Sequence, residues 1–206
     1  MVKSTRAEPR IRHLQRVELP SDTTQLARYL IGKTLVHERP EGRLSGRIVE
    51  TEAYVVGDAA SHSFRGQTPR NRAMFLKRGH AYVYFVYGNW FALNVSAEEP
   101  GVGAAVLLRA LEPLEGISLM QRVRNGADIN DLARGPGRLA SALQIDRRLD
   151  GMDLCAPGAL WLGSAVRPTG RIGCSVRIGI SREAHRPLRF YERQNPCVSG
   201  PKHLNH

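Results

Sequence analysis

The sequence predicts a single-domain α+β fold, with a curved, mostly antiparallel sheet, surrounding helices and a protruding aromatic β-hairpin. The 206 residues are 42% hydrophobic, which suits one globular core of ordinary size. Short apolar and β-branched segments predict strands, and segments with a helical apolar stripe predict helices. Gly88-Asn89, a favourable hairpin turn, separates two segments that are rich in aromatic residues.

The chain is expected to begin with a flexible basic arm, residues 1–16, followed by one domain over residues 17–206. The basic residues that characterise the arm are Arg6, Arg10, Arg12 and Arg16. Because the arm has no apolar central segment, it is not a secretory signal. We find no repeat, low-complexity segment or linker that would divide the rest of the chain.

Turn residues and apolar spacing predict the elements of the first half of the domain. Ser21 or Asp22 can cap a helix that Gly32 ends. Thr68-Pro69 resembles a helix start, with a capping hydroxyl followed by proline. In chain order we expect a helix at Ser21–Ile31, strands at Thr34–Glu38 and Arg47–Tyr54, a loop at Gly57–Gly66, a helix from Thr68, and hairpin strands at Ala81–Tyr87 and Trp90–Ser96.

The same signals predict the second half. An apolar run predicts a strand at Ala104–Leu111, and an apolar stripe predicts a helix at Pro113–Arg124. Asp131–Ile145 is predicted helical on both sides of Gly135-Pro136-Gly137, a tight turn that can present backbone N–H groups. The remaining predictions are short strands at Ala159–Leu162, Arg171–Ile172, Val176–Ile180 and Pro187–Tyr191, and a loose tail from Ser199.

The strand that follows the turn-like Gly46 is the most informative feature of the chain. Because side chains alternate along a strand, Ile48, Glu50, Glu52 and Tyr54 are expected to share one face. A carboxylate that is buried without a partner is costly or takes up a proton. This face therefore meets water, meets cations, or forms a site.

Arg109 is the second informative feature, since it interrupts the apolar run of its predicted strand and should be partly buried. A buried guanidinium needs an anionic partner, either a protein carboxylate or a ligand anion, and Glu50 and Glu52 are candidates. Two interpretations stay open. One is a structural Glu–Arg pair that joins two strands, and the other is a carboxylate that the cation keeps ionised and able to act as a base.

The charge of the chain favours a nucleic-acid partner. Thirty Lys and Arg residues against 19 Asp and Glu leave a net charge of +11. Most of the basic residues are Arg, whose flat fork suits phosphate. A solvated basic surface is the alternative that charge alone leaves open.

Disulfide and metal chemistry are not predicted. Cys155, Cys174 and Cys197 are widely spaced and odd in number, and the seven His residues show no metal-binding spacing. The cysteine usage indicates a reducing compartment. Since no apolar run is long enough for a membrane span, we expect no membrane partner.

A set of long, contiguous motifs occurs between about Leu26 and Val198. They are Arg47–Tyr54, Ala60–Ser63, Gln67–Arg72, Tyr82–Gly88, Leu107–Pro113, Gly135–Gly137 and Pro187–Tyr191. In content and order this set resembles the alkyladenine (3-methyladenine) DNA glycosylase family. The resemblance implies excision of damaged purines from duplex DNA.

The resemblance also implies a mechanism. A base inside a duplex cannot be reached, so the nucleotide is expected to flip into a pocket. Glu52 is expected to be the general base that activates a water and stabilises the oxocarbenium character of the transition state. Arg109 is expected to hold Glu52, the water or the sugar-phosphate, and Glu50 to be structural support.

The pocket residues follow from the same resemblance. Tyr54, His62 and Tyr84 are expected to sandwich the flipped base, and each electron-rich ring face attracts a cationic alkylated purine by about 0.5–2 kcal/mol. Asn94 is expected at the pocket floor, opposing the exocyclic amino group of normal guanine. Tyr87 is expected to enter the minor groove and fill the vacated stack. Without the resemblance, core tyrosines and an ordinary loop histidine are the alternatives.

The hairpin poses a geometric question. A two-residue turn would pair Tyr87 with Trp90 and leave Tyr84 and Asn94 on opposite faces. A three-residue loop or a bulge would bring Tyr84 and Asn94 to one face, and we expect this irregular hairpin.

Three arginines are expected to bind the DNA backbone. Arg70 and Arg72 lie in the first turn of the helix predicted from Thr68, where a helix N-terminus adds to their attraction for phosphate. A solvated surface turn is an equal alternative. Arg138 completes the set, beside the predicted turn at Gly135.

The expected enzyme is a monofunctional DNA-3-methyladenine glycosylase that leaves an abasic site. No lysine falls in the matched pocket motifs, so a Schiff base is not indicated and no metal or organic cofactor is expected. The expected partner is double-stranded DNA containing damaged purines, bound by a monomer inside the cell. Two other functions stay open: a non-catalytic module that binds damaged or bent DNA, and a carbohydrate hydrolase using Glu50 and Glu52, which the charge disfavours.

Overall fold

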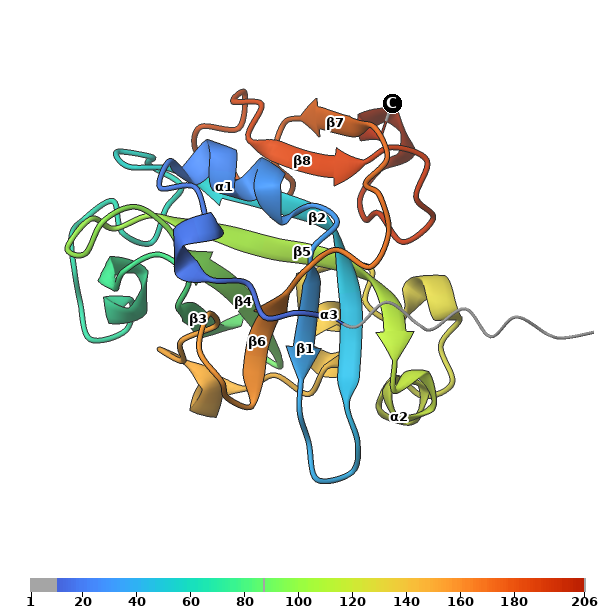
Figure 1. Cartoon of the computed structure of the whole chain (residues 1–206). Helices are drawn as coiled ribbons and strands as arrows, with labels where there is room; N and C mark the ends of the chain where they lie inside the picture. The colour runs from blue at the N-terminus through green and yellow to red at the C-terminus, as the bar shows by residue number, and fades with distance from the viewer. Residues whose placement is uncertain (1–10, 87, 206) are drawn as a thin grey trace, which may run out of the picture.

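The computed structural model describes residues 11–86 and 88–205, and it confirms the single-domain α+β fold with a curled antiparallel sheet (Figure 1). The strands are β1 (Thr34–His37), β2 (Leu44–Tyr54), β3 (Ala81–Val86), β4 (Trp90–Ser96), β5 (Ala105–Glu115), β6 (Leu160–Gly163), β7 (Ile172–Ser175) and β8 (Arg189–Glu192). The helices are α1 (Thr23–Leu30), α2 (Ile117–Val123) and α3 (Pro136–Ala142), and short 3₁₀ turns connect several elements.

The two longest strands, β2 and β5, form the centre of the sheet. Hydrogen-bonded neighbours follow the order β3-β4-β5-β2-β1-β6, and β8 also pairs with β2 and carries β7. One edge of β2 pairs with β5, and two strands share the other edge. There, β1 pairs with the first part of β2, and β8 pairs with residues 50–52. Residues 50–52 therefore have strands on both sides, β5 and β8, which keeps them away from solvent.

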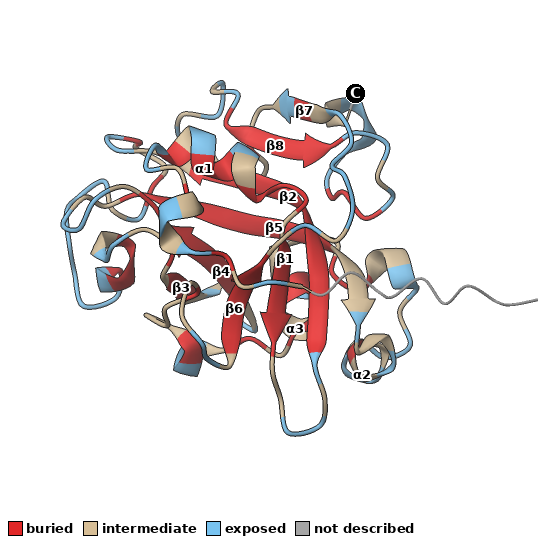
Figure 2. Cartoon of the chain, viewed as in Figure 1, coloured by how far each residue is buried: buried red, intermediate tan, exposed pale blue. Residues whose placement is uncertain are grey.

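Helix α1 covers one side of this central pair, as Figure 1 shows, and closes the main apolar core. Asp22 caps the helix by accepting a hydrogen bond from the Gln25 backbone N–H at 2.8 Å, which confirms the predicted cap. Leu26 and Leu30 are fully buried, and the Thr51 hydroxyl donates to the Ala27 carbonyl at 2.9 Å. The buried residues coincide with the central strands (Figure 2).

The alternation predicted for β2 is wrong at its middle. Ile48 lies in the main core, whereas Val49 packs in a second cluster with Ala110 and Tyr191. The pairing of β2 with β5 shifts register between Ile48 and Glu50, and such irregularities re-aim side chains. Ile48 therefore does not share the face of the two glutamates. Gly46 lies inside β2 rather than in a turn before it.

Four further predictions of elements are wrong. Helix α3 begins at Pro136 and residues 132–135 are not helical, so the chain is not helical on both sides of Gly135-Pro136-Gly137. Strand β5 continues through Pro113 to Glu115, so α2 begins only at Ile117. Thr68 does not cap a helix; its backbone N–H and hydroxyl bond to the Asn71 side chain, and a single 3₁₀ turn starts at Arg72. The predicted strand at residues 176–180 has no strand pairing.

Both ends of the described chain pack on the domain. Within the predicted basic arm, residues 1–10 lie outside the described residues, while His13 stacks on Trp161 at 3.8 Å between ring centres and Leu14 is buried. The tail predicted to be loose from Ser199 is instead attached. The Ser199 backbone N–H donates to Glu50 at 2.6 Å, and Arg189 donates to the Leu204 carbonyl at 3.1 Å.

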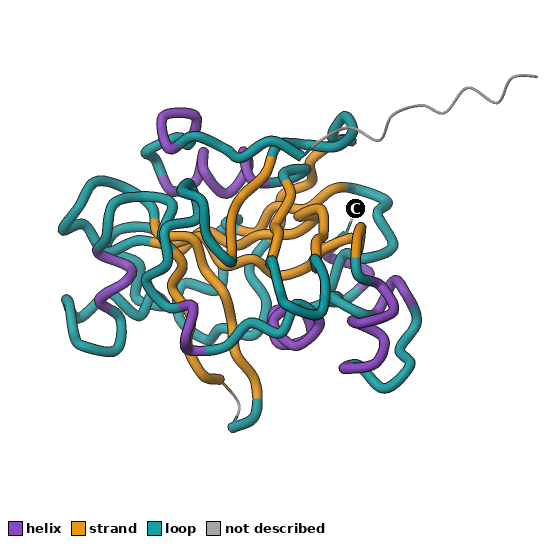
Figure 3. The backbone as a smooth tube through the Cα atoms, turned by 60° about the horizontal axis from the view of Figure 1, so that its bottom comes forward, coloured by secondary structure: helices purple, strands orange, loops and turns teal. Residues whose placement is uncertain are grey.

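The hairpin of β3 and β4 has the irregular connection that we expected. Val86 pairs with Trp90, so residues 87–89 separate the strands, and Tyr82 pairs with Asn94. The two strands of this hairpin run side by side in Figure 3. This register brings Tyr82, Tyr84 and Asn94 to one face. Tyr87 lies outside the described residues, and the protrusion of the hairpin stays a prediction.

Candidate active site

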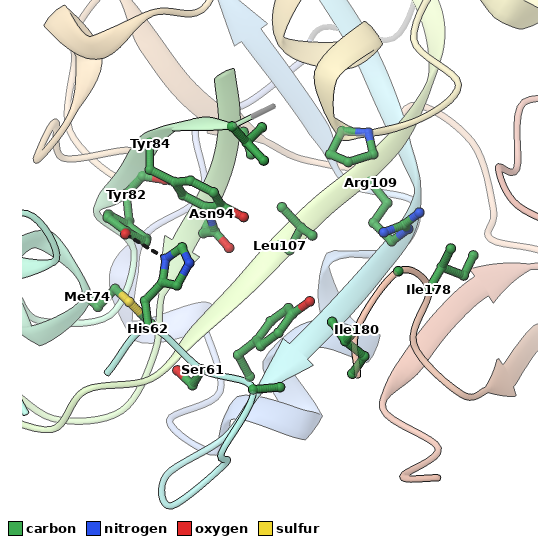
Figure 4. A pocket seen from close by; sticks show the side chains of 16 residues that line it. Ser61, His62, Met74, Tyr82, Tyr84, Asn94, Leu107, Arg109, Ile178 and Ile180 are labelled. Carbon is green, nitrogen blue, oxygen red and sulfur yellow. Dashed lines mark hydrogen bonds between the residues drawn. The ribbon is translucent and has the colours of Figure 1, made fainter. Parts of the chain in front are cut away.

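A cavity of about 220 Å³ opens where the hairpin meets the centre of the sheet. Its volume is below the range of about 300–1,000 Å³ that is usual for drug-sized ligands, and suits a single ring system. In Figure 4, His62, Tyr82, Tyr84 and Asn94 lie on one side, while Arg109, Ile178 and Ile180 lie on the other. The principal lining residues are Tyr54, Ser61, His62, Met74, Tyr82, Tyr84, Asn94, Leu107, Arg109, Pro136, Ile178, Gly179 and Ile180.

Glu52 lies directly behind this lining and is fully buried. Its Oε1 accepts a hydrogen bond from the Ile178 backbone N–H at 2.8 Å, and its Oε2 accepts one from the Tyr54 hydroxyl at 3.1 Å. Burial raises the pKa of Glu52 above its ordinary value, although Arg109 and the Ile178 N–H act in the opposite direction. Two of its partners, Tyr54 and Ile178, line the cavity, so Glu52 is one hydrogen bond away from it.

The pKa of Glu50 shifts in the opposite direction to that of Glu52, although Glu50 is equally buried. Its Oε1 accepts from Arg189 Nε at 2.7 Å and from Arg109 Nε at 3.0 Å, and its Oε2 accepts from the Ser199 N–H. Burial opposes the charge on Glu50, but the two arginines outweigh it and lower the pKa. Both oxygens of Glu50 are therefore engaged in holding other groups.

Arg109 connects the two carboxylates. Its Nη1 lies 3.3 Å from Oε1 of Glu52, while its Nε donates to Glu50. Burial opposes its charge, but Glu52 and Glu50 outweigh the burial and raise the pKa of the guanidinium. Arg109 also lines the cavity, so the residue that pairs with both carboxylates is exposed to the cavity as well.

Four aromatic side chains form the walls of the cavity. His62 lies against Tyr84, with 4.6 Å between ring centres, and its Nδ1 shares a hydrogen bond of 2.9 Å with the Tyr82 hydroxyl. Desolvation by the surrounding protein lowers the pKa of His62, and the positive charge of Arg70 lowers it further. The lowered pKa favours a neutral imidazole. Burial raises the pKa of Tyr54, so its hydroxyl keeps its proton and can donate to Glu52.

Asn94 lines the cavity opposite Tyr82 on the hairpin. It is buried, and its Nδ2 donates to the Tyr82 carbonyl at 3.2 Å. This bond orients the side-chain amide, and it leaves the amide oxygen without a described hydrogen bond of its own.

The three arginines expected at the DNA backbone are all exposed, and none of them lines this cavity. Arg138 lines an open depression of about 500 Å³ that Arg109 and Pro136 share with the cavity. Arg70 lines a separate depression with Phe85, on the hairpin. Arg72 lies in the 3₁₀ turn after Asn71.

Sequence reasoning missed Tyr82, the Ile178 N–H and Arg189. For two of these residues the sequence contains a pattern that could have identified them. Tyr82 precedes Tyr84 by two residues on one strand, and Arg189 interrupts an apolar strand just as Arg109 does. A backbone N–H such as that of Ile178 has no such signal, because any non-proline residue supplies one.

Among residues 11–86 and 88–205, no group of three or more His, Cys, Asp or Glu side chains has an arrangement that could hold a metal ion. In the same part of the chain, no helix has the length and apolarity that crossing a membrane requires.

Comparisons with known proteins agree on one family. Its profile, described as methylpurine-DNA glycosylase (MPG), matches residues 18–196. A relative from Mesorhizobium japonicum that carries the name 3-methyladenine DNA glycosylase is 63% identical over 191 residues, 93% of this chain and 92% of the relative. The DNA-3-methyladenine glycosylase of Mus musculus is 45% identical over 192 residues, covering 84% of this chain and 57% of the mouse protein.

Proposed function

Since the chain belongs to the methylpurine-DNA glycosylase family, we propose that it flips alkylated or otherwise damaged purines out of duplex DNA and hydrolyses their N-glycosidic bond. The enzyme is a DNA-repair glycosylase, a hydrolase that acts on N-glycosyl bonds. The water that attacks the sugar is activated by Glu52, and the product is an abasic site. The observation that carries this proposal is the position of Glu52, one hydrogen bond behind an aromatic cavity that suits one base.

The aromatic lining of the cavity supports base flipping. A purine in a duplex is stacked and paired, so its glycosidic bond and ring faces cannot meet Tyr54, His62 and Tyr84 together. Rotation of the nucleotide out of the helix brings the base between these rings. Damaged pairs are more easily opened, which adds to the selectivity of this step.

The electrostatics of the walls support alkylated purines as substrates. Such bases carry positive charge, and aromatic faces attract cations. His62 has a lowered pKa and stays neutral near pH 7, so it does not repel a cationic base. A cationic base is also a good leaving group that needs no protonation.

Glu52 fits the role of general base. Its raised pKa makes the ionised carboxylate a better proton acceptor than an ordinary glutamate. Its negative charge, next to the sugar, would stabilise the positive charge that develops as the bond breaks. Because Glu52 is fully buried, the attacking water reaches Oε2 when the Tyr54 hydroxyl moves aside, and Arg109 keeps the carboxylate in place.

The remaining contacts are assigned with the family as support. Asn94 lies at the pocket floor, where its amide opposes the amino group of normal guanine. Arg70, Arg72 and Arg138 are exposed cations that would bind backbone phosphates. Tyr87, outside the described residues, is the wedge that fills the vacated stack.

We further propose that the enzyme acts as a monomer on double-stranded DNA inside the cell, without metal or organic cofactor. A hydrolytic mechanism with water is supported by the lining of the cavity, which contains no lysine among the described residues. A Schiff base at this site would need one.

The alternative of a carbohydrate hydrolase needs two working carboxylates. Glu50 does not meet this need, because Arg189 and the Ser199 N–H, which hold its two oxygens, do not line the cavity. Oε2 of Glu52, in contrast, is held by the hydroxyl of Tyr54, a residue of the cavity lining. A single substitution distinguishes the proposed glycosylase from the alternative of a non-catalytic DNA-binding module.

Glu52→Gln should keep its affinity for duplexes that contain 7-methylguanine and lose excision under single turnover. Glu192→Gln is a matched control, since Glu192 is a buried glutamate that pairs with Arg47 and does not line the cavity. Excision by Glu52→Gln at the wild-type rate would refute the proposed role of Glu52.

A further inference from the structure

The mechanism above does not use Arg177, which lies over the ring of Tyr54. The central carbon of its guanidinium is 4.6 Å from the ring centre. The Arg177 side chain is fully buried and does not line the cavity, whereas Tyr54 does. The ring of Tyr54 therefore lies between the guanidinium and the cavity, with one face toward the cation.

Arg177 is held firmly in this position. Asp58, which is also fully buried, accepts hydrogen bonds from both Nη1 and Nη2, the second at 3.1 Å. The Ala53 carbonyl accepts from Nη1 at 3.0 Å. In the described part of the chain, Nε has no hydrogen-bond partner. Burying the Arg177–Asp58 pair costs the desolvation of two charges, and the unsatisfied Nε adds a further cost. An apolar side chain could support the Tyr54 ring without these costs.

We propose that Arg177 is a specificity-determining residue. A cation on one face of an aromatic ring makes the opposite face less attractive to a second cation, because the attraction comes from the negative potential of the ring. Arg177 thus weakens the preference of Tyr54 for cationic purines and widens the pocket's range to neutral damaged purines. This inference rests on the proposed function, which assigns the ring of Tyr54 to stacking on the flipped base.

Because Asp58 and Arg177 carry opposite charges, removing one or the other should change the preference for cationic over neutral bases in opposite directions. Its charge partly cancels that of Arg177 as felt on the far side of the ring. Loss of the Arg177 charge leaves Asp58 and favours a cationic base. Loss of the Asp58 charge leaves the guanidinium uncompensated and favours a neutral base. A purely structural role for the pair predicts instead that either change slows the excision of all bases alike.

The test compares the excision of 7-methylguanine, which is cationic, with that of hypoxanthine, which is neutral, from otherwise identical duplexes under single turnover. Arg177→Gln should raise the ratio of the two rate constants, cationic over neutral, and Asp58→Asn should lower it. Each shift should lie between about twofold and thirtyfold, the range that one cation–π contact can supply. Arg177→Lys keeps the charge and should shift the ratio less than Arg177→Gln.

Arg47→Gln is the matched control. Arg47 is also fully buried, pairs with a glutamate, Glu192, and has an unsatisfied Nε, but it does not line the cavity. This variant should leave the ratio at the wild-type value. If Arg177→Gln does not fold, Asp58→Asn alone carries the test, because a general loss of structure does not lower the ratio.

An unchanged ratio in the two variants, or a shift in the same direction in both, overturns the inference and leaves the proposed function standing. Failure of the wild-type enzyme to excise 7-methylguanine overturns the proposed function and this inference with it.

Discussion

Arg189 donates from Nε to Oε1 of Glu50 at 2.7 Å, and both side chains are fully buried. The same oxygen accepts from Arg109 Nε, whose guanidinium then reaches Glu52 with Nη1 at 3.3 Å. Two glutamates and two arginines thus form a buried group of zero net charge. Glu50 fixes Arg109, and Arg109 positions the carboxylate of Glu52, which lies behind the cavity lining.

The two glutamates should respond oppositely to neutral substitution. The folded-state pKa of Glu50 is lowered, so its ionised form stabilises the fold above the ordinary carboxyl pKa, and this stability is lost as the pH falls through the folded-state value. The folded-state pKa of Glu52 is raised, so its ionisation costs stability above the ordinary pKa.

Glu50→Gln should therefore lower the free energy of unfolding at pH 7 by about 3–5 kcal/mol, as expected for a broken buried ion pair. Glu52→Gln should lose far less, or gain stability. Urea denaturation at pH 7 measures both, with Glu99→Gln, an exposed glutamate, as control. Equal losses in the two variants would contradict the arrangement.

The pH dependence of excision should report Glu52. A general base must be ionised, so the single-turnover rate on 7-methylguanine should rise with pH through the raised pKa of Glu52. Because Arg109 lowers that pKa, Arg109→Gln should move the midpoint to higher pH, besides slowing the reaction. Arg148→Gln, on the surface, should leave the midpoint in place. A midpoint that does not move in Arg109→Gln argues against the coupling of Arg109 to Glu52.

Tyr82 should support catalysis through His62. Tyr82→Phe removes the hydroxyl that shares the 2.9 Å hydrogen bond with His62 Nδ1. The loss should lower the stability by about 1 kcal/mol and slow excision several-fold, since the imidazole is no longer oriented against the base. Thermal unfolding and single-turnover rates measure the two effects. Tyr29→Phe, on α1, is the control, and a wild-type rate in Tyr82→Phe would exclude this role.

The exposed arginines should set the salt dependence of DNA binding. Each Gln substitution at Arg70, Arg72 or Arg138 should reduce the slope of log affinity against log salt by about 1, if each arginine binds one phosphate. Fluorescence anisotropy on an undamaged duplex between low and moderate salt measures the slope. Arg148 is exposed but donates to Asp146 through both Nε and Nη2, whereas Arg138 reaches Asp131 only at 3.4 Å, so Arg148→Gln should change the slope less.

Local pattern was enough to predict some of the contacts around Glu52 and Arg109. Alternation on β2 placed Glu52 and Tyr54 together, and their hydrogen bond confirms that they share a face. The hairpin register, with residues 87–89 between Val86 and Trp90, also followed from sequence reasoning combined with the family resemblance. An arginine in an apolar strand predicted the burial of Arg109, which the structure confirms.

Errors arose where distant segments decide the local structure. The shift in pairing with β5 turns Ile48 into the core, although nothing within the strand itself indicates it. The tail after Ser199 lacks regular apolar spacing, yet its backbone satisfies the buried Arg189 and Glu50. Such contacts depend on which surfaces meet after folding.

The sequence by itself determined the chemistry available to this protein: a carboxylate strand, an aromatic hairpin and a buried arginine, each recognisable within a few residues because strand periodicity is local. Only the tertiary structure decided which groups Glu52 and Glu50 each pair with. Ile178 is 126 residues from Glu52, and Arg189 is 139 residues from Glu50. The partners of each carboxylate, and hence the opposite directions of the two pKa shifts, exist only once β8 and the segment before it have packed beside β2.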